Sequence, residues 1–119
     1  MERSDYLEIR LLRVGATPDY VGYPYLVDSI LLVWERAEAG RNLAKLVYPV
    51  VAAKYGVNPA SVERGIRTLI ATLWQTGDRR SLVHLLGRDY DRPPGNSTFI
   101  GTIARRMSLN YKDADEPKT

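Results

Sequence analysis

The feature that most constrains this chain is a pair of helix signals separated by a tight turn in the middle of the sequence. Pro49–Tyr55 is a short segment followed by Gly56, and Asn58 precedes the longer segment Pro59–Thr76, which Gly77 follows. Asparagine caps a helix through its side-chain oxygen, proline suits the first helical position, and glycine is common where a helix ends. The sequence therefore predicts a short helix, a three-residue turn and a long helix.

The longer predicted helix has two distinct faces at 3.6 residues per turn. One face is apolar and is formed by Val62, Ile66, Leu69, Ile70 and Leu73. The opposite face carries Ala60, Glu63, Arg64, Arg67 and Ala71. This is the anatomy of a helix-turn-helix, whose second helix packs its back on the domain and presents its polar residues outward. The alternative is an ordinary amphipathic surface helix with a Glu-Arg face.

The polar face has residue types that suit base recognition in duplex DNA. Arginine can donate two parallel hydrogen bonds to O6 and N7 of guanine, and glutamate can accept one from N4 of cytosine. Gly65 costs helix stability, about 0.8–1 kcal/mol relative to alanine, so a glycine here suggests a close approach. We expect Gly65 and Ala60 to keep the outer surface thin enough for the backbone to approach a groove.

Helical signals continue through the rest of the chain, and no segment alternates apolar and polar residues as a half-buried strand does. The expected helices are Asp5–Val14 with a cap at Ser4, Tyr25–Ala39, Ser81–Leu86, and a last helix from a cap at Asn96 or Ser97 to about Leu109, with a single turn after Thr17 and a charged, frayed tail over Lys112–Thr119. We therefore predict one all-α domain over residues 1–119, with about six helices and a helix-turn-helix at about 49–76.

Composition and charge exclude some classes of protein and favour others. There is no cysteine, which excludes disulfides and thiolate metal sites. No apolar run reaches the length of a membrane span, and the first residues lack the apolar core of a signal peptide. Residues 41–80 hold seven basic and two acidic side chains, whereas residues 1–40 hold four and seven. We expect a cytoplasmic protein with an anionic partner at its basic middle third.

Few residues are candidates for catalysis or metal binding. His84 is the only histidine, and no cysteine or carboxylate pair stands at ligand spacing beside it. Asp89 and Asp91 lie in a loop rich in arginine and proline, where we expect them to be solvated. No serine has a His-Asp set, and no Gly-rich phosphate loop is present. We therefore expect no catalytic residue, no cofactor and no metal, and a protein that is not an enzyme.

The aromatic side chains are open to two interpretations. Four tyrosines are numerous enough to stack on single-stranded bases, namely Tyr20, Tyr23, Tyr25 and Tyr48. Tyrosines also cover cores with their hydroxyl groups outward, and we favour that role because these residues lie in the acidic part of the chain or at its edge. Trp34 and Trp74 fall on apolar helix faces and are expected in the core.

Motifs in a fixed order extend over roughly residues 7–112. They are Gly15 with Tyr23-Pro24-Tyr25-Leu26, then Leu46-Val47-Tyr48-Pro49, Ala52-Ala53-Lys54-Tyr55 and Val62-Glu63-Arg64-Gly65-Ile66-Arg67, and finally Asn96-Ser97-Thr98-Phe99-Ile100. This series resembles the C-terminal effector domain of the sporulation response regulator, the stage 0 sporulation protein A family. Several spaced motifs in one order are more specific than any one of them.

The resemblance implies a six-helix DNA-binding module that binds short promoter boxes. It also implies head-to-tail dimers on tandem boxes, and contacts with RNA polymerase and its sigma factor during transcription control. The family's base-contacting Glu-Arg pair falls on Glu63 and Arg64, and a neighbouring arginine falls on Arg67. Ser61 stands where the family has a basic base-contacting residue, and Thr68 stands where it has a histidine. The family's receiver domain, with its phosphorylated aspartate, has no counterpart in these 119 residues.

Two functions follow as hypotheses. The first is sequence-specific duplex binding by a nucleoid-associated transcription regulator, with base contacts from Ser61, Glu63, Arg64 and Arg67 and phosphate or positioning contacts from Lys54, Asn58 and Thr68. The second is an adaptor or antagonist that keeps the fold without specific DNA contacts. The Glu-Arg-Arg face favours the first hypothesis, whereas Ser61 and the low overall charge favour the second.

Overall fold

The computed structural model describes residues 1–112, and every regular element in that range is helical. The elements are α1 (Arg3–Arg13), α2 (Tyr23–Glu35), the 3-10 helix η1 (Ala37–Arg41), α3 (Leu43–Leu46), α4 (Tyr48–Tyr55), α5 (Pro59–Thr76), α6 (Arg79–Leu86) and α7 (Asn96–Asn110). Six of the described helices have eight residues or more, and α3 is one turn of four. The all-α prediction is confirmed, while the tail predicted to fray lies, from residue 113 onward, outside the described residues.

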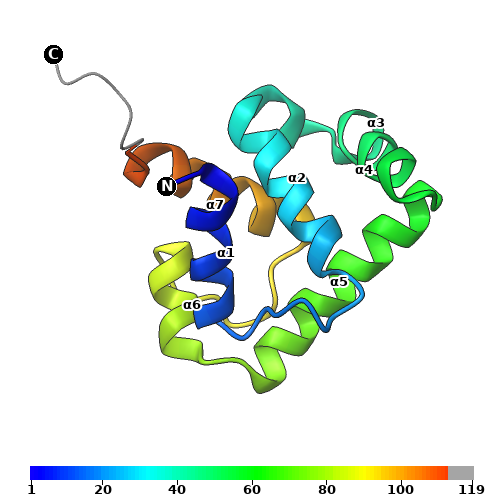
Figure 1. Ribbon diagram of the computed structural model, residues 1–119. Helices are drawn as coiled ribbons and strands as arrows, with labels where there is room; N and C mark the ends of the chain where they lie inside the picture. The colour runs from blue at the N-terminus through cyan, green and yellow to red at the C-terminus, as the bar shows by residue number, and fades with distance from the viewer. Residues whose placement is uncertain (113–119) are drawn as a thin grey trace, which may run out of the picture.

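Two helices, α2 and α7, form the centre of the domain. They pack on each other, and the other long helices surround them: α1, α4 and α5 contact α2, and α5 and α6 contact α7. Figure 1 shows α1 and α6 on one side of this centre and α3, α4 and α5 on the other. Leu26 and Ile30 of α2, Ile66 and Ile70 of α5 and Phe99 of α7 are at most 1% exposed, so one apolar core joins these elements.

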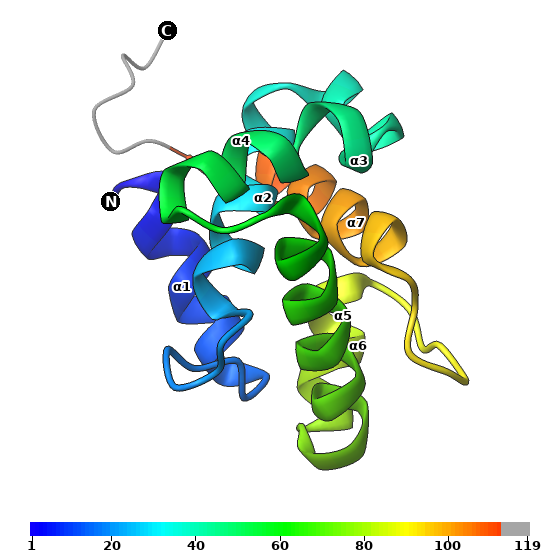
Figure 2. The same cartoon turned by 90° about the vertical axis from the view of Figure 1, so that its right-hand side faces the viewer.

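The helix-turn-helix is present as predicted. The Asn58 side-chain oxygen accepts a hydrogen bond from the backbone N–H of Ser61 at 3.0 Å, which caps α5. Gly56 ends α4 in the left-handed conformation, with φ of +66°, where a residue with a Cβ would be strained. All five residues of the predicted apolar face are buried: Val62, Ile66, Leu69, Ile70 and Leu73. Figure 2 shows α4 above α5, with the turn between them.

The structure explains the glycine at position 65 by a close contact that the sequence did not reveal. A Cβ built on Gly22 would lie 2.1 Å from the carbonyl oxygen of Gly65, so the turn before α2 touches the backbone of α5. A Cβ on Gly65 would in turn lie 3.1 Å from the ring of Tyr25 and 3.3 Å from the Gly22 Cα atom. The expectation that Gly65 thins the outer surface for a groove is therefore corrected: this glycine faces the turn before α2.

The helix starts differ from the predictions at α1 and α2. Ser4 was expected as a cap, but α1 already begins at Arg3 and has no side-chain cap. The α2 helix begins at Tyr23, two residues early, because Pro24 is compatible with a first helical turn. It ends at Glu35, where an extended residue separates it from η1, so the expected single helix over Tyr25–Ala39 is two elements.

The segment after Thr17 and the start of α6 also need correction. Residues 17–22 form hydrogen-bonded turns and not a helical turn of their own. The α6 helix begins at Arg79, two residues before the predicted Ser81, because Asp78 caps it. The Asp78 carboxylate accepts hydrogen bonds from the backbone and side chain of Ser81, and these bonds lower the pKa of Asp78.

The last helix begins at Asn96, which was expected as its cap and not as its first residue, and its cap is therefore different. Gly95 precedes α7, which has no side-chain cap, and both expected caps are used in other contacts. The Asn96 side chain donates hydrogen bonds toward α4 and α5, and the Ser97 hydroxyl donates one to the Gly40 carbonyl oxygen at 3.3 Å. These bonds join the start of α7 to the helix-turn-helix and to η1.

The aromatic residues lie mostly in or against the core. Trp34 is buried, while Trp74 is only partly buried and donates its indole N–H to the carbonyl oxygen of Tyr90 at 3.3 Å. Trp74 was expected in the core, but it only packs against the core, because its indole N–H needs a hydrogen-bond partner near the surface. Tyr23 and Tyr48 are buried, as expected for tyrosines that pack on a core.

Replacing Ile66 with alanine should lower the free energy of unfolding by about 2–5 kcal/mol, since it leaves a cavity in the fully buried face of α5. Chemical denaturation followed by circular dichroism measures the change. Val21 is 78% exposed and provides the control, because Val21→Ala should leave the unfolding transition almost unchanged. An Ile66→Ala protein that unfolds at the wild-type denaturant concentration would show that α5 is oriented differently.

Replacing Gly22 with alanine should destabilise the domain by about 1–3 kcal/mol or more, as overpacking does, because the new methyl group would collide with the Gly65 backbone. Gly101→Ala is the matched control: no atom lies within 4 Å of its Cβ position, and it lies within α7. That control should gain up to about 1 kcal/mol from helix propensity. Two variants of equal stability would contradict the close contact between the turn and α5.

Candidate nucleic-acid interface

The outer face of α5 is the surface that could enter a DNA groove. Arg64, Arg67 and Thr68 are exposed on it, and Ser61 and Glu63 are partly exposed. The apolar side of the same helix is buried, so packing on the core fixes the direction of this face. The five predicted side chains on α5 therefore share one accessible side of the helix.

Arg64 is the least constrained charged residue on this surface. Its side chain has no hydrogen bond or ion pair with any of residues 1–112. Together with Ser61 and Thr68 it lines a groove of about 530 Å³, whose other wall is the turn over residues 19–22. The guanidinium group has its full set of N–H donors available for an acceptor in this groove or beyond it.

Glu63 and Arg67 are paired with each other, which the sequence pattern did not establish. The Arg67 Nη1 atom lies 2.6 Å from the Glu63 Oε1 atom, one helical turn away. Glutamate four residues before a basic residue is the favourable orientation of such a pair. The pair is solvent-exposed, with 63% of the Arg67 side chain and 34% of the Glu63 side chain accessible. Its contribution to stability is therefore small, and it mainly orients the two side chains.

Asn96 is a positioning residue that sequence reasoning missed. Its side-chain Nδ2 atom donates to the Tyr48 hydroxyl at 3.0 Å and to the backbone carbonyl oxygen of Glu63 at 3.0 Å. One amide group thus joins α7 to the first and second helices of the helix-turn-helix. Tyr48 is buried, and burial raises the pKa of its hydroxyl. A polar residue at a helix start gave no sequence signal for this contact, because it fits a cap equally well.

The residues expected near phosphates are partly engaged inside the domain. The Lys54 Nζ atom lies 2.9 Å from the Asp28 Oδ2 atom, and the Tyr55 hydroxyl donates to the same carboxylate at 2.6 Å. The hydrogen bond with Asp28 raises the pKa of Lys54. The Asn58 oxygen is used by the cap and also accepts from the Ser61 hydroxyl at 3.3 Å. Lys54 keeps 62% of its side chain exposed, so its ammonium can still reach an anion.

Two other features are absent from the part of the chain that the structure describes. Within residues 1–112, no group of three or more His, Asp or Glu side chains is arranged to hold a metal ion. None of the described helices is both long enough and apolar enough to cross a membrane.

A comparison with protein-family models gives one match that extends over most of the chain. Residues 8–107 match the model described as the C terminal of sporulation initiation factor Spo0A. The matched range runs from α1 to near the end of α7 and includes the whole helix-turn-helix. The chain therefore belongs to the family of Spo0A C-terminal domains, which are DNA-binding effector domains of a response regulator that controls transcription in sporulation.

Proposed function

We propose that this domain binds specific sequences in duplex DNA as a transcription regulator, with α5 in the major groove. The observation that carries the proposal is the exposed Arg64 side chain, which has no partner among the described residues and projects from a helix fixed by its buried face. A recognition helix needs both properties: a rigid support, and polar side chains near its N-terminus that are free to contact bases.

The three charged residues on α5 have different roles in this proposal. Arg64 contacts guanine through O6 and N7, because its fork of donors is unoccupied. Glu63 accepts from cytosine N4, or excludes bases that offer only acceptors at that position. Arg67 contacts a base or a phosphate, and its bond with Glu63 holds one of its N–H groups in place. The Ser61 hydroxyl donates to Asn58, so it can accept a hydrogen bond from a base amino group but must exchange that bond before it can donate to a base.

Phosphate contacts come from residues around the turn and along α5. Lys54 lies in the last turn of α4, and its ammonium has three donors, not all of which the Asp28 carboxylate can occupy. The Asn58 oxygen is committed to the cap, but its amide nitrogen remains a donor for a phosphate oxygen. Thr68 is exposed and offers its hydroxyl. Such contacts fix the position of a protein on DNA without selecting a sequence.

Family membership supports three further parts of the proposal. The domain binds short promoter boxes and pairs head to tail on tandem boxes. It regulates transcription through RNA polymerase and its sigma factor. It works in the cytoplasm, associated with the nucleoid.

A second candidate function is that of an adaptor or antagonist without specific DNA contacts. The observation in its favour is the pairing of Glu63 with Arg67 and of Lys54 with Asp28. These pairs leave Arg64 as the one charged candidate of the four without a partner in the described part of the chain. The pair of Glu63 with Arg67 is exposed on both sides, however, and such a pair contributes at most about 1 kcal/mol, so DNA can replace either partner at little cost. Lys54 is also exposed, and it can contact a phosphate while it remains bonded to the less accessible Asp28.

The domain should bind duplex DNA with a steep dependence on salt. Each phosphate neutralised by a basic side chain contributes close to one to the slope of log affinity against log salt concentration. Fluorescence anisotropy with a labelled duplex at several salt concentrations measures this slope. Affinity that stays constant from low to physiological salt would contradict the proposal and would favour the adaptor.

Arg64→Ala and Lys54→Ala should weaken DNA binding in different ways. Loss of Arg64 should cost about 1–3 kcal/mol on the preferred site and relax discrimination at one base position. Loss of Lys54 should weaken binding to all sequences similarly and reduce the salt slope by about one. Selection from randomised duplexes, followed by affinity measurements, separates these outcomes.

Arg36→Ala is the matched control, because Arg36 is an exposed arginine between α2 and η1, away from α5. It should leave the preferred sequence unchanged. If Arg64→Ala also leaves the preferred sequence unchanged and affects every duplex alike, Arg64 makes no base contact.

A further inference from the structure

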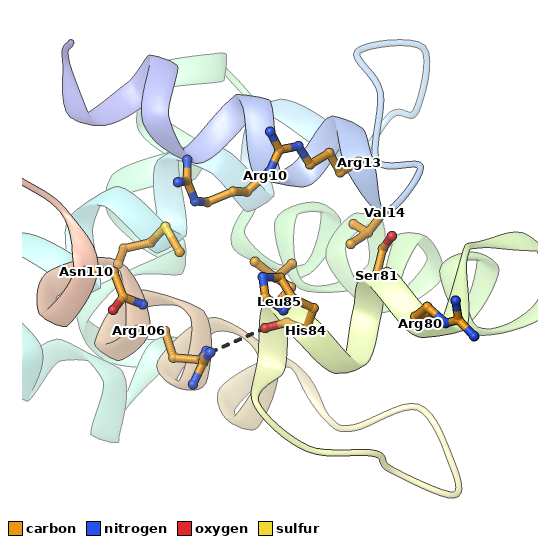
Figure 3. A pocket seen from close by; sticks show the side chains of 10 residues that line it. Arg10, Arg13, Val14, Arg80, Ser81, His84, Leu85, Arg106 and Asn110 are labelled. Atoms are coloured by element: carbon orange, nitrogen blue, oxygen red, sulfur yellow. Dashed lines mark hydrogen bonds between the residues drawn. The ribbon is translucent and has the colours of Figure 1, made fainter.

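A second cationic site lies between α1, α6 and α7, on the side of the core away from α4 and α5 (Figure 1). It is a cavity of about 380 Å³, and side chains from three helices surround it in Figure 3. Its basic lining consists of Arg10, Arg13, Arg80, Arg106 and His84. Its other lining residues are Val14, Ser81, Leu85, Met107 and Asn110.

Among the residues that the structure describes, the lining of this cavity has an excess of positive charge. Four arginines contribute, and none of the ten lining residues is acidic. Like charges around one concavity repel one another, and an anion between them removes that repulsion. Asp78, which caps α6, accepts hydrogen bonds from Ser81 and from the Arg80 N–H, and its negative charge acts on Arg80. Arg10, Arg13 and Arg106 form no ion pair with a carboxylate of the described residues.

Two of the arginines are held in place by backbone groups. Arg106 donates to the His84 carbonyl oxygen at 3.3 Å, drawn as the dashed line in Figure 3, and Arg10 donates to the Tyr6 carbonyl oxygen at 2.9 Å. Each of these bonds uses one N–H group, and the Arg10 guanidinium also stacks on the Tyr6 ring, with its Cζ atom 3.4 Å from the ring centroid. Arg13 and Arg80 are exposed, and their side chains have no hydrogen bond or ion pair with the described residues. The cavity thus combines two oriented guanidinium groups with two that are free to close on a ligand.

The shape and the walls of this cavity fit a small molecule. Val14, Leu85 and Met107 are buried and give the cavity an apolar part of its lining. An apolar wall with a few polar anchors, in a volume of roughly 300–1,000 Å³, is typical of small-ligand sites. Guanidinium groups match phosphate oxygens with two parallel hydrogen bonds, so phosphate is the anion that this donor set suits best.

We propose that the cavity between α1, α6 and α7 binds a small phosphorylated molecule, with the phosphates held by Arg10, Arg13, Arg80 and Arg106. This site is separate from the outer face of α5 and does not depend on the proposed function. Free pyrophosphate and a nucleotide share the required chemistry. The apolar side of the cavity distinguishes them, because only the nucleotide has a base to place against it.

Titration of the 15N-labelled protein with inorganic pyrophosphate and, separately, with adenosine diphosphate tests the site at constant ionic strength. Amide shifts should saturate and should be confined to α1, α6 and the second half of α7. The R13A/R80A double variant should bind at least about tenfold more weakly, because two charged hydrogen-bonding groups are lost. The R36A/R41A variant removes the same charge from exposed positions outside the cavity and should bind as the wild type does.

Three results would overturn the proposal. Shifts that never saturate, or that spread over the whole surface, would mean non-specific screening by the anion. Equal weakening in R13A/R80A and R36A/R41A would show that net charge, and not the cavity, controls binding. A loss of duplex affinity in R13A/R80A as large as that in Arg64→Ala would assign the four arginines to a DNA contact, whereas duplex affinity equal to that of R36A/R41A supports a separate site.

Discussion

Burial of one side of α5 against α2 and α7 is the interaction on which the rest of the structure depends. Ile66 and Ile70 lie in the same core as Phe99 of α7, and this packing fixes which residues face outward. Two polar or steric contacts then fix the helix in position: the close approach of Gly22 to the backbone of α5, and the hydrogen bonds of Asn96. A helix that is fixed by its buried face and by contacts to its backbone can present side chains in a defined geometry, as recognition of base edges requires.

The charged residues around α5 divide into those that are paired within the domain and one that is free. Glu63 and Arg67 form an exposed ion pair, and DNA can replace either partner at little cost. Lys54 forms an ion pair with the Asp28 carboxylate of α2. Arg64 needs no exchange of partners before it can bind. For this reason we propose that Arg64 makes the central base contact. The contributions of Glu63, Arg67 and Lys54 to DNA binding depend also on the cost of breaking their ion pairs. The arginines between α1, α6 and α7 line a second cationic site on the other side of the core, with a different shape and a different proposed ligand.

The sequence predicted the elements whose signals are local and left open the contacts that arise only in three dimensions. Asn58, Pro59 and the period of Val62 to Leu73 were sufficient for the helix-turn-helix and its buried face, because capping and amphipathicity are encoded within a few residues. The roles of Gly65 and Asn96 could not be predicted, since each depends on a partner more than 30 residues away. The spacing of four residues allows Glu63 and Arg67 to form an ion pair on one face of the helix. Spacing alone does not show whether the two side chains bond to each other or extend separately into solvent.

The most direct test of the central claim is chemical protection of guanine N7 in a selected duplex, measured with the protein at saturating concentration. The N7 atom faces the major groove, where the proposed arginine contact lies. With the wild-type domain, one guanine in the binding site should be protected from methylation. With Arg64→Ala, the same guanine should become reactive while the rest of the site stays protected. If its protection is unchanged in the variant, or if no guanine is protected by the wild type, α5 does not place Arg64 against a base in the major groove.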